Sequence, residues 1–268
     1  MAKTITRIYT QKRQGRFNVD LDNQYAFSIS NDTFVKFSLF KGTQLDDSEI
    51  SEIKRYDQFS ILKNKALIFI NHQQRSQKEV VDKLKTNDDI PLEIIDEVVN
   101  ELKNIGLIND QEYAKNFIST QINASIDGPS VIKQKLFKKG VPSFVVEKAI
   151  VVFDTQTQTE HIAKLADKFI SINQKKLGSN ALKNKLYSFL YSKGYSTDLI
   201  KEYVDNVILD ENDDQQLMLA KNALQKIWTR YQKYGNQRKY RASQFLYSKG
   251  FSADNIDIAI REQENEGK

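Results

Sequence analysis

The stretch FLYSKGYSTD at residues 189–198 returns as FLYSKGFSAD at residues 245–254. In both copies an apolar run ends in Lys-Gly, and an aromatic residue, Ser and Asp follow. Glycine just after a helix readily adopts the left-handed conformation that ends it, while Ser and Asp favour the start of another helix. The repeated decapeptide therefore predicts a corner between two helices.

Two further segments have the same order of residues. QKLFKKGVPSFVVEKAI (134–150) is a clear copy, and VVDKLKTNDDIPLEIIDEVV (80–99) is a weaker one with Asp89 in place of the glycine. The predicted turn glycines are Gly140, Gly194 and Gly250. A further helix is predicted upstream of each corner, at residues 66–75, 113–123, 162–173 and 219–231. Because three short helices form a marginal core alone, we expect neighbouring units to stack.

The first thirty residues have the spacing of strands instead. In RFNVDLDNQYAFSIS (16–30) apolar and polar residues alternate on both sides of an Asp-Asn pair, which predicts a hairpin. A strand is predicted before it at 4–15, and a short helix after it at 32–42. Asp46 and Glu49 resemble a capping box that opens another helix.

The predicted fold is mainly α. It is an elongated, curved array of about four tandem three-helix modules of helix-turn-helix type, preceded by a small β-hairpin/α segment. The predicted divisions are a β-rich segment with short helices at 1–56 and modules at 57–107, 108–155, 156–209 and 210–268, the last with a polar C-terminal tail.

Composition excludes several classes of protein. The 268 residues are 40% hydrophobic and include no cysteine, so a folded chain without disulfides or thiolate metal sites is expected. The N-terminal residues have no signal-peptide core, and no apolar run approaches the roughly 20 residues of a membrane span. These features predict a cytoplasmic protein with no membrane association.

Catalytic motifs are absent from the sequence. His72 and His161 fall in different modules, and neither a glycine-rich phosphate loop nor a G-x-S-x-G nucleophile motif occurs. We therefore expect no enzyme activity, no catalytic residues, no metal and no cofactor.

Positive charge is segregated along the chain. The net charge is +5, yet residues 128–146, 175–197 and 215–253 contain no Asp or Glu. Such windows predict a contact surface for nucleic acid or an acidic partner. The candidate contact residues in these windows are Lys133, Lys135, Lys138, Lys139, Lys175, Lys176, Lys183, Lys185, Lys193, Arg230, Lys233, Arg238, Lys239, Arg241 and Lys249.

Aromatic residues lie among these cations and allow two interpretations. Trp228 and Tyr231 could stack on bases, although their spacing on one helix face favours core packing. Tyr191 and Tyr247, just before the corners, could be contact residues or packing residues. In the N-terminal hairpin a group of cations could form a second contact surface or protect a strand edge by charge: Arg7, Lys12, Arg13 and Arg16.

Three motifs in order resemble one known family. SQKEVVDKL (76–84), IIDEVVNELKNIGLINDQEYAKNFI (94–118) and GPSVIKQKLFKKGV (128–141) are similar to the RecX family of bacterial recombination regulators. The resemblance covers roughly residues 57–260. The preceding β segment resembles the N-terminal extension of members from low-GC Gram-positive bacteria.

The resemblance implies a non-enzymatic protein that binds the groove of the RecA filament and suppresses its ATPase and strand exchange. We expect the protein to be a monomer. Single-stranded DNA is a further implied partner, and double-stranded DNA is another candidate. Lys133, Lys135, Lys138 and Lys139 occupy the basic helix where the family pattern is richer in Arg, which weakens bidentate recognition. Two alternatives stay open: a direct, non-sequence-specific DNA-binding repeat protein, and a scaffold for an unrelated protein.

Overall fold

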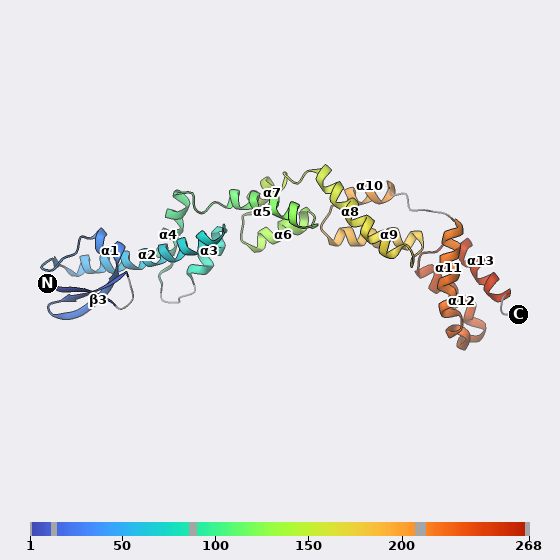
Figure 1. The fold of residues 1–268 in the computed structure, drawn as a ribbon, viewed down its shortest axis with the longest axis horizontal. Coiled ribbons are helices and arrows are strands. Elements are labelled where there is room, and N and C mark those ends of the chain that lie inside the picture. The colour runs from blue at the N-terminus through green and yellow to red at the C-terminus, as the bar shows by residue number, and fades with distance from the viewer. Residues whose placement is uncertain (1, 12–14, 86–89, 207–212, 266–268) are drawn as a thin grey trace. The chain divides into compact units, whose positions relative to one another are not determined.

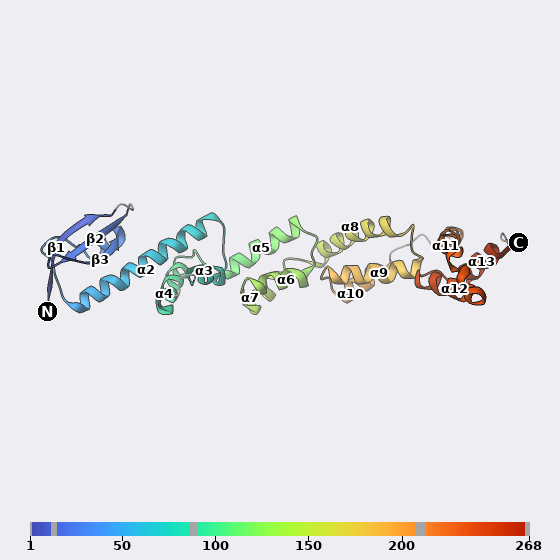
Figure 2. The same ribbon diagram turned by 90° about the horizontal axis from the view of Figure 1, so that it is seen from below.

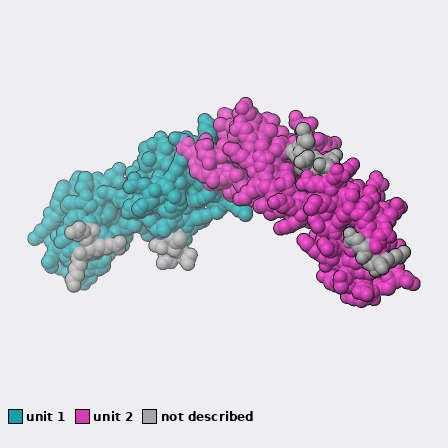
Figure 3. Space-filling view, turned by 45° about the vertical axis from the view of Figure 1, so that its right-hand side comes forward, with its two compact units in different colours: residues 1–115, 136–146 teal, residues 116–135, 147–268 magenta. Residues whose placement is uncertain are grey.

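The computed structural model describes residues 2–11, 15–85, 90–206 and 213–265 (Figure 1). These residues form thirteen α-helices, one 3-10 helix and four strands, so the chain is mainly helical as predicted. Two compact units comprise residues 1–115 with 136–146 and residues 116–135 with 147–268 (Figure 3). The weak copy's Asp89, together with Lys12 and Arg13, lies outside the described residues.

The N-terminal residues of the first unit form a small antiparallel sheet with the strand order β3-β2-β1-β4. Its strands are β1 (Lys3–Thr10), β2 (Arg16–Leu21), β3 (Gln24–Ser30) and β4 (Gln44–Leu45). Asp22 and Asn23 both have positive φ, which confirms the predicted hairpin. Strand β4 was not predicted. It pairs with Lys3 and Thr4 of β1. The loop before it is held by Ile5, whose N–H donates to Thr43 O (2.8 Å) and whose carbonyl accepts from Gly42 N (2.8 Å).

Two helices pack against this sheet, as Figure 2 shows for the longer one. They are α1 (Asn31–Lys36) and α2 (Asp47–His72). The predicted capping box is confirmed, because Asp46 accepts from the Glu49 N–H and Glu49 accepts from the Asp46 N–H. Helix α2 crosses the predicted division between residues 56 and 57 without a break, since neither Gly nor Pro interrupts it there.

A buried carboxylate ties α2 to the sheet and to α1. Asp57 is 5% exposed and accepts hydrogen bonds from Ser30 N (2.6 Å), Thr33 Oγ1 (2.9 Å) and Arg16 Nη2 (3.1 Å). Arg16 also donates to the carbonyl of Ser28 at 3.0 Å. A buried charge needs such partners, so Arg16 is a structural residue here rather than a contact residue.

The remaining helices follow in groups of three (Figures 1 and 2). After α2 the first group has α3 (Gln77–Leu84) and α4 (Leu92–Asn104). The later groups are α5 (Asp110–Ala124), α6 (Pro129–Lys138) and α7 (Ser143–Ile150); α8 (Thr155–Asn173), α9 (Ser179–Ser192) and α10 (Thr197–Asn206); and α11 (Asp213–Trp228), α12 (Arg238–Ser248) and α13 (Ala253–Asn265). Each upstream helix that the sequence predicted overlaps the first helix of a group.

Apolar side chains at helical spacing form separate cores within the groups. In the first group Leu62, Val80 and Leu102 belong to one buried cluster. In the fourth group Trp228 and Tyr231 pack against a cluster that includes Leu224. Core packing is therefore the correct interpretation of these two aromatic residues. The fourth group also contains a 3-10 helix, η1 (Arg230–Gln237), between its first two α-helices.

Candidate contact surface at the module corners

The three predicted turn glycines share one backbone conformation. The φ angles of Gly140, Gly194 and Gly250 are +76°, +90° and +82°, in the region that L-amino acids with a side chain rarely adopt. The residue after each glycine is buried, namely Val141, Tyr195 and Phe251. Each corner therefore ends a helix and anchors the start of the next one in the core.

In the second unit each corner also receives the start of a helix from the preceding module. The N–H of Gly128 donates to Lys193 O (2.7 Å), and Ser130 N donates to Gly194 O (3.0 Å). In the same way, Gly178 N donates to Lys249 O at 2.9 Å. The carbonyls left unpaired at the end of α9 and α12 are thus satisfied by the preceding module. We call this arrangement a joint.

Backbones touch directly in these two joints. A Cβ atom on Gly128 would lie 2.6 Å from the carbonyl carbon of Gly194, and one on Gly194 would lie 2.7 Å from the nitrogen of Val131. Gly178 meets the backbone of Gly250 at similarly close range. The glycines are therefore required for contact between modules as well as for the turn itself.

The first unit contains a related joint that uses side chains. Ser76, at the start of α3, donates its hydroxyl to Lys139 O at 2.6 Å, and Lys139 Nζ forms an ion pair with Glu79 at 2.7 Å. The N–H of Gln77 donates to Asp110 Oδ1 at 2.8 Å. Side-chain hydrogen bonds here replace the backbone contact that glycine permits in the second unit.

The ion pair in this joint changes the acidity of both partners. Burial alone would raise the pKa of Glu79, but Lys139 and the Ser76 N–H hold it below the ordinary value of 4.5. The hydrogen bond to Glu79 raises the pKa of Lys139. Lys139 is thus a structural member of the joint as well as a candidate contact residue.

Acidification is expected to weaken this joint. Because the pKa of Glu79 is lowered on folding, its stabilisation is complete above the ordinary carboxyl range and disappears as the pH falls through its folded pKa. Burial raises the pKa of Asp110, which has the opposite effect, so Glu79→Gln is the necessary comparison. The difference in unfolding free energy between the wild type and Glu79→Gln should shrink between about pH 6 and about pH 3. A constant difference would contradict this assignment.

Three exposed aromatic residues stand at equivalent places beside the corners. Phe137, Tyr191 and Tyr247 each lie three residues before the turn glycine and are 42%, 61% and 75% exposed. The structure thus makes Tyr191 and Tyr247 surface residues rather than packing residues. A lysine follows each of these aromatic residues two positions later, just before the turn glycine: Lys139, Lys193 and Lys249.

The candidate cations divide by exposure and by partner. The exposed ones are Lys138, Lys175, Lys176, Lys185, Arg230, Lys233, Lys239 and Arg241, and the half-buried ones are Lys133, Lys135, Lys139, Lys183, Lys193, Arg238 and Lys249. Ion pairs link Lys133 to Glu147, Lys135 to Asp127 and Lys239 to Glu264. A paired lysine must exchange its carboxylate for any new partner, so exposed Lys138 is a stronger candidate than Lys133 or Lys135.

In the fourth module cations surround aromatic rings. Lys233 Nζ and the Arg241 guanidinium lie 5.1 Å and 5.2 Å from the centre of the Tyr234 ring. Arg238 instead packs on Trp228. Its guanidinium lies 3.8 Å from the centre of the Trp228 ring, and its Nη2 donates to Trp228 O at 2.8 Å. Arg238 is therefore structural, whereas Lys233 and Arg241 lie at the surface beside the Tyr234 ring.

The described part of the chain offers neither a metal site nor a membrane helix. Its residues include no cluster of His, Asp and Glu that could hold a metal ion. None of the helices in the described ranges is both long and apolar enough to cross a membrane.

Comparisons with known proteins agree with the repeated corner. Residues 3–46 match the family model for the N-terminal domain of regulatory protein RecX, and residues 109–150 match the second three-helix domain of RecX. The model for its third three-helix domain matches twice, at 156–204 and 213–260. The chain belongs to the RecX family. Its third and fourth modules resemble the same RecX domain, which accounts for the two copies of FLYSKG.

Relatives extend this similarity to nearly the whole chain, and solved structures extend it over more than half of the chain. The regulatory protein RecX of Leuconostoc mesenteroides is 37% identical over 98% of this chain and 98% of its own length. That of Bacillus subtilis is 35% identical over 97% of this chain and 98% of its own. A crystal structure of regulatory protein RecX matches 76% of this chain and all of its own, with a TM-score of 0.65 and 31% identity. RecX from Lactobacillus salivarius matches 56% of this chain and 96% of its own, with a TM-score of 0.54 and 35% identity.

Proposed function

We propose that this RecX-family chain is a negative regulator of homologous recombination. In this proposal it binds the filament that RecA forms on single-stranded DNA and inhibits its ATPase and strand exchange. The supporting observation is the repeated corner, where an exposed aromatic residue and a lysine recur at the same position in three modules. The relatives from Leuconostoc mesenteroides and Bacillus subtilis are both named regulatory protein RecX, which supports the same proposal.

A repeated contact surface suits a repeated ligand. A filament presents one protomer after another, so modules linked in one chain can each make a modest contact with a successive protomer. Linked contacts strengthen one another through effective concentration, even though none of them is strong alone. Exposed tyrosines are suited to such contacts, because a large ring loses little conformational entropy when it is buried.

Removing two corner tyrosines is expected to weaken inhibition without unfolding the protein. Each interface aromatic residue can contribute more than about 1 kcal/mol, so Tyr191→Ala with Tyr247→Ala should raise the half-inhibitory concentration at least about tenfold. The assay is the ATPase of RecA on single-stranded DNA, titrated with the full chain. Tyr25→Ala is the matched control, since Tyr25 is 62% exposed but lies on β3. Equal inhibition by the double variant and the control would contradict the corner assignment.

Direct DNA binding is the second candidate function, and the cations around Tyr234 favour it. If Lys233 and Arg241 bind phosphates, Lys233→Gln with Arg241→Gln should reduce the salt dependence of binding to an oligo-dT strand. The log–log slope should fall by about 0.7 for each phosphate that is no longer neutralised. Lys41→Gln is the control, because Lys41 is an exposed lysine in the loop before β4. An unchanged slope would exclude Lys233 and Arg241 as phosphate ligands.

The two functions are separated by recovery of RecA from lysate on the immobilised full chain. If RecA itself is bound, recovery should persist after nuclease treatment. If DNA links the two proteins, nuclease should abolish it. Recovery of a different protein in place of RecA would favour a scaffold instead.

A further inference from the structure

Strand β1 of the N-terminal sheet has one edge that is paired along only part of its length. It pairs with β2 through residues up to Thr10. On its other side β4 pairs with Lys3 and Thr4, and Gly42 and Thr43 of the preceding loop bond to the backbone of Ile5. Within the described ranges, no strand lies against this edge beyond Ile5. An exposed edge of this kind presents backbone donors and acceptors to any strand that approaches it.

The alternation of an antiparallel ladder shows which groups point outward. The N–H of Gln11 donates to Arg16 O on β2 (2.9 Å), and Tyr9 stands opposite Asn18. Residues at odd positions here therefore direct their backbone groups towards β2. The N–H and C=O groups of Ile8 and Thr10 consequently point away from β2, towards the unpaired edge.

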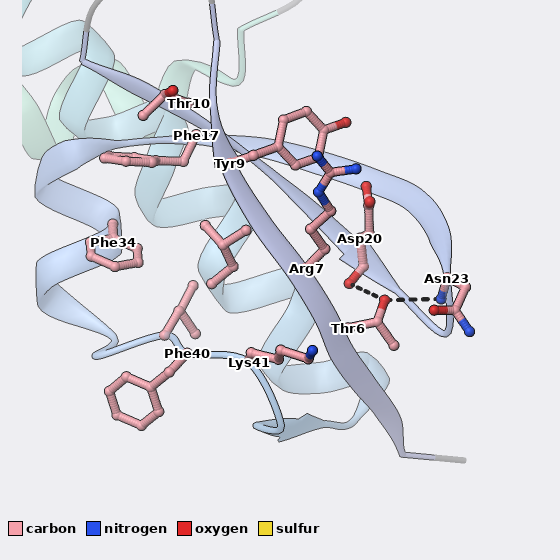
Figure 4. Close-up of a pocket in the computed structure, with 12 residues that line it drawn as sticks. Thr6, Arg7, Tyr9, Thr10, Phe17, Asp20, Asn23, Phe34, Phe40 and Lys41 are labelled. Atoms are coloured by element: carbon pink, nitrogen blue, oxygen red, sulfur yellow. Dashed lines mark hydrogen bonds between the residues drawn. The ribbon is translucent and has the colours of Figure 1, made fainter.

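A cleft of about 810 Å³ follows this edge (Figure 4). On the core side of the strand it is lined by Ile8, Phe17, Phe34, Leu39 and Phe40. Phe40 is 63% exposed, and the rings of Phe17 and Phe34 stack at 4.9 Å. The hydrophobic core of the sheet is thus open at the place where the next strand would lie.

Cations flank the cleft on both sides of the strand. Arg7 lies over the ring of Tyr9 at 4.6 Å on one side, and Lys41 lies on the other side, next to Phe40. Asp20 is the one carboxylate among the lining residues and belongs to β2, one strand away from the edge. The charge beside the edge itself is therefore positive.

We propose that the free edge of β1 binds an extended peptide segment of a protein partner by strand addition. Alternate side chains of the segment are apolar and enter the cleft beside Ile8 and Phe40, while those between them are acidic and face Arg7. A peptide fits better than a nucleic acid, because only a peptide supplies alternating N–H and C=O groups to Ile8 and Thr10. This surface is separate from the corners and does not depend on the RecA proposal.

The test uses the full chain and a labelled, end-blocked peptide of alternating valine and glutamate. Binding should protect the amide protons of Ile8 and Thr10 from hydrogen exchange and leave Tyr9, already paired with β2, unchanged. Phe40→Ala should weaken binding at least about tenfold, and Tyr25→Ala, an exposed tyrosine on the same sheet, should not. A peptide of alternating valine and lysine should bind at least about tenfold more weakly, because of like charge.

Four results would overturn the proposal. The first is no binding of the valine–glutamate peptide, and the second is binding without protection of Ile8 and Thr10. Protection that appears without peptide and rises with protein concentration would assign the edge to a second copy of this chain. Direct binding of a labelled oligo-dT strand that Phe40→Ala weakens and that excludes the peptide would assign the cleft to nucleic acid.

Discussion

Alanine at Gly178 is expected to destabilise the joint between the third and fourth modules by about 2–4 kcal/mol. The new methyl group would enter the backbone of Gly250, and the modules could accommodate it only by separating. Separation would break the hydrogen bond from Gly178 N to Lys249 O. Since the φ angle of Gly178 is −72°, alanine fits its backbone. The loss of stability therefore comes chiefly from the contact between the modules and not from strain in the backbone of Gly178.

A matched pair of variants separates this packing from the conformation of the turn. Gly250 and Gly106 have φ angles of +82° and +78°, but only a Cβ on Gly250 would meet a neighbouring residue, whereas a Cβ on Gly106 would meet open space. Gly106→Ala should therefore lose only the backbone preference of about 1 kcal/mol, and Gly250→Ala should lose clearly more. Hydrogen exchange, read against urea concentration, measures the loss from Gly106→Ala in the α4 amides and the loss from Gly250→Ala in the α9 and α12 amides. Equal losses would show that the joint contributes nothing.

Alanine at Asp57 is expected to destabilise the N-terminal sheet by about 3–5 kcal/mol, because it removes one partner of a buried ion pair. Arg16 would keep its charge without a carboxylate, and the buried N–H of Ser30 and the hydroxyl of Thr33 would each lose an acceptor. The effect should appear in hydrogen exchange of the β2 and β3 amides and leave the α12 amides unchanged.

Asp47→Ala is the control for Asp57→Ala. Asp47 also pairs with a cation, Lys3 at 3.6 Å, but both side chains are well exposed, so the loss should stay within about 1 kcal/mol. If both variants lost the same amount, burial of Asp57 would have no energetic consequence. If α12 responded to Asp57→Ala as strongly as β2, the sheet would not be an independent unit of stability.

The corners could be predicted because their signals are local. A glycine after an apolar helix end, followed by Ser and Asp, specifies a turn whatever surrounds it, and Gly194 and Gly250 both have the expected positive φ. The joints depend instead on residues far apart in sequence, such as Gly128 and Lys193. The signal was present in the glycines that precede α6 and α9, but nothing local says what a glycine will contact.

Which candidate cations are exposed and which are paired with a carboxylate could not be predicted for the same reason. Lys135 and Lys138 stand on one helix, yet Lys135 pairs with Asp127 whereas Lys138 is exposed. Acid-free windows identify where cations gather, but a carboxylate from another segment can neutralise any one of them. Strand β4 escaped prediction because two residues are too short for an alternating pattern to be recognised.

The central claim is tested most directly by the ATPase of RecA on single-stranded DNA, titrated with the full chain at low and at high salt. A chain that engages several protomers of a filament should inhibit strongly at well below one copy for each RecA protomer, and inhibition should persist at the higher salt. Inhibition that needs about one copy per protomer or more and disappears with salt would contradict the account. It would mean that the basic surface merely competes with RecA for DNA.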